Sequence, residues 1–198
     1  DFSSTIGFVG VQLYSTQSYQ DGDLRGIGLA YRNLADAEFA GIDLTGASFH
    51  GSNLKNVNMT DAIIKGVDFE GTTGFYPDQF RSTKSYKEKA IQGVRLCQKM
   101  MTGFDLSGFD LSSVDFTEAT LADVSMQDAK ITGIYLSRTT EKGFTPDQLY
   151  STKNWQEGDL SAVHLDNNDL SGWDFSGQNL TGANFASSTL YDARFEDA

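Results

Sequence analysis

Large apolar residues recur at every fifth position through most of this chain. In the first block these positions, called centres below, run as Leu24, Leu29, Leu34, Phe39, Leu44, Phe49, Leu54, Met59, Ile64 and Phe69. The same spacing returns from Ile91 to Leu136 and again from Leu160 to Phe195, always with Leu, Phe, Ile or Met. A period of five fits neither a helix nor a strand, and a fixed short period is typical of a solenoid. We therefore expect the centres to form a buried ladder inside an all-β solenoid.

The residues around each centre support a unit that turns every five residues. Asp or Asn often precedes the centre, as in Asp43, Asn53 and Asp174, and such side chains bond to nearby backbone and tolerate turn conformations. Two residues before the centre, small or β-branched residues recur, and Gly is frequent two residues after it. Each unit thus supplies a large inward residue, a small inward residue and a turn.

Stretches such as Ala47-Ser48-Phe49, Ser52-Asn53-Leu54-Lys55 and Ala183-Asn184-Phe185-Ala186 resemble the pentapeptide repeat family, whose motif centres on Leu or Phe preceded by Asp or Asn. The resemblance covers most of the chain. It implies a right-handed quadrilateral β-helix with four pentapeptides in each coil.

Three related connectors, residues 7–20, 74–87 and 143–156, interrupt the repeats. They share Gly-Phe, then Gln followed by Leu or Phe, then Ser-Thr, then an aromatic residue. Thr145-Pro146-Asp147-Gln148 predicts a helix start, Tyr76-Pro77-Asp78-Gln79 predicts one with a poorer cap, and Gly10 makes the first connector a weaker case. We expect each connector to place a short helix on one side of a coil. The aromatic residues are expected to act as an eleventh centre: Tyr19, Tyr86 and Trp155.

We expect residues 1–198 to form a single solenoid built from related modules. The modules would be residues 6–73, 74–142 and an incomplete 143–198, after residues 1–5 from the end of a preceding module. Phe2 precedes Phe8 by six residues, as Phe69 precedes Phe75, which makes Phe2 a candidate last centre of that earlier module. The chain is therefore expected to be part of a longer repeat array.

The formal net charge of −12 is spread unevenly. Residues 1–73 carry 9 acids and 4 bases, residues 74–142 carry 9 of each, and residues 143–198 carry 9 acids and 2 bases. Direct nucleic-acid binding is unlikely for so acidic a chain, despite a basic cluster in residues 81–99. The single cysteine, Cys97, excludes an intrachain disulfide and is expected to point outward or sit at a corner. No apolar run is long enough to span a membrane.

The sequence offers no constellation that points to chemistry. The two histidines, His50 and His164, fall at surface or corner positions of the repeat, and no Cys/His spacing suits zinc. Neither a phosphate-binding Gly-rich loop nor a nucleophile elbow is present. We therefore predict no catalytic, cofactor-binding or metal-ligating residues and no cofactor. Weak Ca²⁺ binding along the acidic ladders is left open.

These observations favour a non-catalytic structural or protein-interaction solenoid, not an enzyme, with a protein partner that the sequence does not identify. End-to-end or side-by-side self-association is possible, and a secreted or cell-surface location is favoured over a cytoplasmic one. The family resemblance implies an alternative, an acidic DNA mimic acting on a type II topoisomerase (DNA gyrase). The neutral middle third of the chain and the lack of a C-terminal dimerisation helix count against that alternative.

Overall fold

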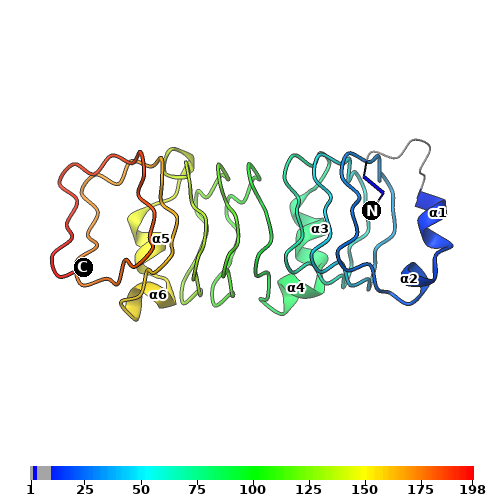
Figure 1. Cartoon of the computed structure of the whole chain (residues 1–198), viewed down its shortest axis with the longest axis horizontal. Coiled ribbons are helices and arrows are strands. Elements are labelled where there is room, and N and C mark those ends of the chain that lie inside the picture. Colours follow the sequence, from blue (N-terminus) through cyan, green and yellow to red (C-terminus); the bar gives the residue numbers. More distant parts are fainter. Residues whose placement is uncertain (1, 4–9) are drawn as a thin grey trace. The chain divides into compact units, whose positions relative to one another are not determined.

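The computed structural model describes residues 2–3 and 10–198, which fall into two compact units, Asp1–Arg95 and Leu96–Ala198. Each unit is a stack of coils with short helices at the connectors (Figure 1). The helices are α1 (Gly10–Tyr14), α2 (Gln17–Gln20), α3 (Pro77–Ser82), α4 (Lys84–Lys87), the 3₁₀ turn η1 (Thr140–Lys142), α5 (Pro146–Tyr150) and α6 (Lys153–Gln156). Among the described residues, no helix is long and apolar enough to cross a membrane. The single solenoid expected for residues 1–198 stays a prediction.

Coils stack through parallel bridges between residues 20 positions apart. One column of the first unit joins Gly28 to Ser48 and Ser48 to Asp68, and a second joins Asn33 to Asn53. A turn every five residues and a bridge every twenty give each coil four sides, as the repeat predicts. Only one residue of each pentapeptide bridges, because the turns leave no room for a longer strand. Right-handed winding remains the expectation drawn from the family resemblance.

Each corner of a coil is a tight turn that follows the centre. The N–H of Ala37 donates to the carbonyl of Leu34 at 3.0 Å, and Asp36 between them has a φ of 61°. This left-handed conformation explains why Gly, Asn and Asp are common two residues after a centre. The residue before the centre also stabilises the turn, because Asn53 Oδ1 accepts a hydrogen bond from the N–H of Lys55 at 3.1 Å. The turn chemistry expected from the sequence is confirmed.

The centres fill the interior of both units. Every centre from Leu24 to Phe175 is buried, which confirms the predicted core ladder. The centres of the last coil depart from the prediction, because Leu190 and Phe195 are 38% and 37% exposed. The last coil of a stack has a neighbour on one side only. Cys97 lies at a corner, as one of the two expectations had it, but it does not point outward, because its side chain is buried. Cysteine packs as a small apolar side chain, and Ala30 at the same repeat position is also buried.

The connectors lengthen a coil without shifting its register. Asp68 bridges Arg95, 27 residues later, and Tyr135 bridges His164, 29 residues later, instead of 20. The extra residues are taken up by the helices, so the faces of the coils above and below remain aligned. This is the regular insertion that the sequence predicts.

Each connector holds two short helices, of which the sequence predicted only the first. The Ser-Thr motif makes the second. Thr152 Oγ1 donates to the carbonyl of Leu149 at the end of α5 and accepts from the N–H of Trp155 in α6, and Thr16 and Thr83 do the same in the other connectors. The predicted eleventh centre is wrong, because the aromatic residue lies half-buried on this second helix. Ser85 and Asn154 are buried there instead.

The Gln shared by the three connectors has a structural role in the second and third. Gln148 Oε1 accepts from the N–H of Thr145 at 2.8 Å, which closes a capping box at the start of α5. Gln148 Nε2 donates to the carbonyls of Leu121 and Val124, both at 2.8 Å, on the underlying coil. Gln79 makes the same contacts at the start of α3. The glutamine therefore fastens each helix to the coil below it.

Candidate functional site

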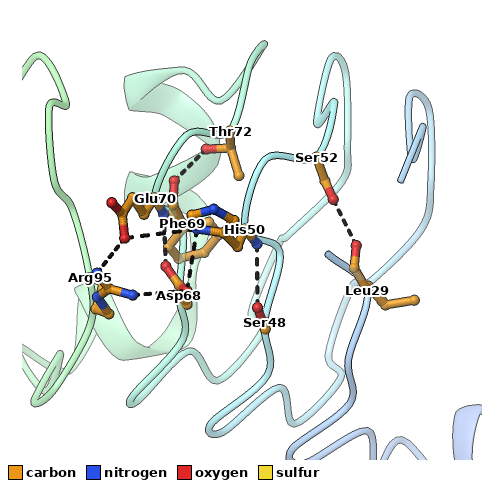
Figure 2. A network of polar contacts seen from close by, with 9 residues as sticks. All are labelled: Leu29, Ser48, His50, Ser52, Asp68, Phe69, Glu70, Thr72 and Arg95. Carbon is orange, nitrogen blue, oxygen red and sulfur yellow. Dashed lines mark hydrogen bonds and ion pairs between the residues drawn. The ribbon is translucent and has the colours of Figure 1, made fainter. Parts of the chain in front are cut away.

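Titratable side chains of the first unit converge on one face of its coils. Asp68 and Arg95 lie on the bridge column that also contains Ser48, and His50 and Glu70 follow the centres Phe49 and Phe69 directly. Stacking in register brings these side chains together although they span residues 50 to 95. Figure 2 shows His50, Asp68, Glu70 and Arg95 turned toward one another.

The contacts form a closed ion-pair network. Arg95 Nη1 lies 3.1 Å from Asp68 Oδ2, and Arg95 Nη2 contacts Glu70 Oε2. His50 Nδ1 lies 3.8 Å from each of these two carboxylate oxygens. Asp68 Oδ1 accepts from the N–H of Glu70 at 2.9 Å, and the edge of Tyr31 meets the His50 ring at a centroid distance of 5.2 Å. The network ties three successive coils together.

One imidazole and two carboxylates within 4.8 Å are a donor set that a divalent metal could use. Arg95 already occupies both oxygens that face His50, so a metal would have to displace the guanidinium. The arrangement is better suited to stabilising the coil that contains α3 and α4 than to holding a cation. The sequence placed His50 at a surface or corner position but did not group it with the other residues. The available signal was their position in the repeat, since Asp68 and Arg95 directly precede a centre and His50 and Glu70 directly follow one.

The other histidine lies in the second unit. His164 stacks on Tyr135 with ring centroids 4.1 Å apart and an interplanar angle of 13°. Both residues belong to one bridge column, and each is partly exposed. The nearby Ser137 hydroxyl donates to Asp166 at 2.8 Å instead of to His164, so these residues do not form a nucleophile and its base.

Two shallow hollows flank the start of α5 in the second unit. One, of about 470 Å³, lies where Thr145 and Gln148 face the coil around Ala122. The other, of about 330 Å³, lies between η1 and α5, with Phe144 and Trp173 beneath Glu141 and Asp169. Sequence reasoning missed both hollows, because they depend on how the connector stands against the neighbouring coil.

The two units differ strongly in charge. Asp1–Arg95 carries 11 acids and 9 bases, a net charge of −2, whereas Leu96–Ala198 carries 16 acids and 6 bases, a net charge of −10. Hydrogen bonds from the hydroxyl and N–H of the following serine lower the pKa of Asp159, Asp169 and Asp174. The Arg138 guanidinium lowers the pKa of Glu118. These carboxylates are therefore ionised at neutral pH.

The family model for pentapeptide repeats matches eight copies in residues 33–72, 101–138 and 159–197. The chain belongs to the pentapeptide repeat family. A comparison with curated protein sequences gives no match.

Several solved structures are similar to this chain. A trypsin-treated variant of QnrB1, a plasmid-mediated fluoroquinolone resistance protein, is 15% identical over 82% of this chain and 88% of that one, with a TM-score of 0.38. A pentapeptide repeat protein from the thylakoid lumen of Arabidopsis thaliana is 17% identical over 75% and 81%, with a TM-score of 0.31. HetL, involved in heterocyst differentiation regulation in the cyanobacterium Nostoc sp. strain PCC 7120, is 20% identical over 94% of both chains, with a TM-score of 0.28. The family assignment rests on the family model, not on these structures.

Proposed function

We propose that this pentapeptide repeat protein is a non-catalytic interaction solenoid, and that its Leu96–Ala198 unit binds a basic surface of a protein partner. The observation that carries the proposal is the charge of this unit, 16 acids against 6 bases. Carboxylates such as Asp159 and Asp174 are held by hydrogen bonds within their turns, and Asp174 also pairs with Arg194 at 2.6 Å, so little side-chain entropy is lost when a basic partner contacts them. An array of fixed negative charges also speeds the approach of a basic partner.

An interaction role fits the described structure better than catalysis does. The interior of each coil is filled by apolar centres, and the hollows of the second unit are open and shallow. General acid–base catalysis needs a group that titrates near the working pH, inside a cleft. The carboxylates of Asp159, Asp169 and Asp174 have lowered pKa values instead. Their chemistry favours lasting electrostatic contacts over proton transfer.

The proposal is tested with the full chain and a fluorescent oligolysine probe. The variant D159N/D174N removes two charges from the acidic unit, and the matched control D36N/D43N removes two from the other unit. Asn replaces Asp because Asn53 forms the same turn bond as Asp43, Asp159 and Asp174. Asn56 likewise adopts the left-handed conformation of Asp36. We expect salt-sensitive binding, measured by fluorescence anisotropy, that weakens in D159N/D174N and is retained in the control. Equal weakening in both variants would mean that only net charge matters, and no binding at low salt would refute the proposal.

The same acidic unit supports a second candidate, the DNA mimic that acts on a type II topoisomerase. A mimic presents carboxylates where DNA presents phosphates, and the charge of −10 in Leu96–Ala198 is the observation that favours it. A supercoiling assay with DNA gyrase separates the candidates. Inhibition near stoichiometric amounts that D159N/D174N relieves would favour mimicry, whereas no effect at a large excess would exclude it.

A further inference from the structure

The third connector contains an insertion that the second connector lacks. Thr72 and Thr139 are equivalent, because each hydroxyl donates to the carbonyl of the preceding centre, at 2.7 and 2.6 Å respectively. One residue lies between Thr72 and the Gly of the Gly-Phe motif, and three lie between Thr139 and that Gly. The additional residues are Glu141 and Lys142, which complete η1. The coil closes without them in the first unit, so the fold does not require this insertion.

The insertion forms one wall of the smaller hollow, called the α5 groove below. The α5 groove has a volume of about 330 Å³ and is lined by the exposed acids Glu141 and Asp169 and by the rings of Phe144 and Trp173, which are only 3% and 6% exposed. The Phe144 and Trp173 rings lie 5.7 Å apart at an angle of 50°. Trp173 stands two residues before the centre Phe175, a position that usually carries a small or β-branched side chain but is also aromatic at Phe104 and Phe109. Trp173 and the inserted Glu141 therefore line the same groove.

The charge of the α5 groove is not compensated within the described part of the chain. Lys142, next to Glu141, turns away and donates to the carbonyl of Glu118 at 2.8 Å. Glu141 is exposed and forms no ion pair among the described residues. Asp169 Oδ1 accepts only from the N–H and hydroxyl of Ser171, at 3.1 and 2.6 Å, so its negative charge also remains available. The groove combines an aromatic base with two carboxylates and no basic lining residue.

We propose that the α5 groove binds an arginine side chain presented by the protein partner. The N–H groups of the guanidinium would donate to Glu141 and Asp169, and the methylene stem would cover the small part of Phe144 and Trp173 that the groove leaves exposed. Arginine suits such a groove because its apolar stem covers aromatic surface while its planar group donates to two carboxylates at once. The inference rests on the proposed function, since it names the group that the acidic unit recognises.

The experiment uses the full chain, labelled with ¹⁵N, and two small probes. N-acetyl-arginine amide carries the guanidinium, and N-acetyl-citrulline amide is its neutral isostere. We expect saturable shifts of the Trp173 indole signal with the arginine probe and at least about tenfold weaker binding of the citrulline probe. Equal binding of the two probes, or no shift of Trp173, would overturn the proposal.

Two variants locate the binding site. Deletion of Glu141 and Lys142 gives the third connector the length of the second and should abolish binding of the arginine probe. E141Q keeps the connector intact and should weaken binding by about tenfold, which keeps the test valid should the deletion fail to fold. E157Q is the matched control, since Glu157 is an exposed acid of the same unit that lies 3.7 Å from Lys153 and away from the groove. Retained binding in E141Q, or an equal loss in E157Q, would contradict the assignment.

The outcome also separates this inference from the proposed function. When oligolysine binding depends on Asp159 and Asp174 but the arginine probe does not bind, only the α5 groove is misassigned. When neither probe binds, the proposed function fails as well.

Discussion

Replacing Gln148 by Met should detach α5 from the coil below it. Met has nearly the same volume and shape as Gln, so the substitution removes hydrogen bonds without opening a large cavity. Four bonds are lost: the two accepted from the N–H and the hydroxyl of Thr145 and the two donated to the carbonyls of Leu121 and Val124. Gln148 is 9% exposed, so water has little access to the two carbonyls.

The expected cost follows from these contacts. A buried polar group left without a partner costs roughly 1–3 kcal/mol. The N–H of Thr145 lies near the surface and can reach water, and the carbonyl of Leu121 keeps the hydrogen bond from the N–H of Val124 at 3.2 Å, so the carbonyl of Val124 dominates. We therefore expect Q148M to lower the free energy of unfolding of the Leu96–Ala198 unit by about 1–3 kcal/mol, with part of the loss offset by the better burial of the thioether.

Urea unfolding followed by tryptophan fluorescence measures this effect, because both tryptophans, Trp155 and Trp173, lie in the second unit. Q127M is the control, since Gln127 is an exposed glutamine of the same unit and its replacement should change stability by less than about 0.5 kcal/mol. A cost for Q148M that matches the control would show that water satisfies the two carbonyls, and the fastening role of the glutamine would then be wrong.

Three further predictions probe the coils themselves. F49A should destabilise the first unit by about 3–5 kcal/mol in a urea titration, since Phe49 is fully buried; a loss below about 1 kcal/mol would contradict the core assignment. G143A should lower the free energy of unfolding by roughly 2–4 kcal/mol, because the φ of Gly143 is +94° and a Cβ would lie 2.7 Å from Ala122. G172A should cost only about 1 kcal/mol, because Gly172 has a φ of +74° but open space around a Cβ, and equal costs would refute the steric argument. D159N should be less stable than the native chain at about pH 7, because hydrogen bonds from Ser161 lower the pKa of Asp159. The difference in the free energy of unfolding should vanish as the pH falls through this lowered pKa, and a difference that stays constant with pH would show that the charge is not involved.

The five-residue period was sufficient to predict the core and the corners. It correctly predicted that the centres between Leu24 and Phe175 are buried, and that Asn53, before its centre, bonds to nearby backbone. These features depend on contacts within one pentapeptide or between identical positions of adjacent coils, so a local pattern encodes them. The outward orientation of Cys97 was misjudged because its burial depends on whether a small side chain packs against the coil at that particular corner.

The candidate sites were less accessible to sequence reasoning. His50, Asp68, Glu70 and Arg95 come together only because coils of 20 and 27 residues stack in register. The α5 groove forms where a two-residue insertion lies opposite Trp173, and no sequence motif predicts that these residues become neighbours.

By itself, the five-residue period determined that the chain forms a solenoid with an apolar interior, because it places the same large residue and the same turn in every unit. The four sides of each coil were implied by the family resemblance. The tertiary structure alone decided which polar side chains become neighbours, how the second helix of each connector is capped, and where an aromatic base meets unpaired carboxylates. The physical reason is that the repeat specifies the position of a residue within its coil, whereas the connector lengths specify which coil lies beside it.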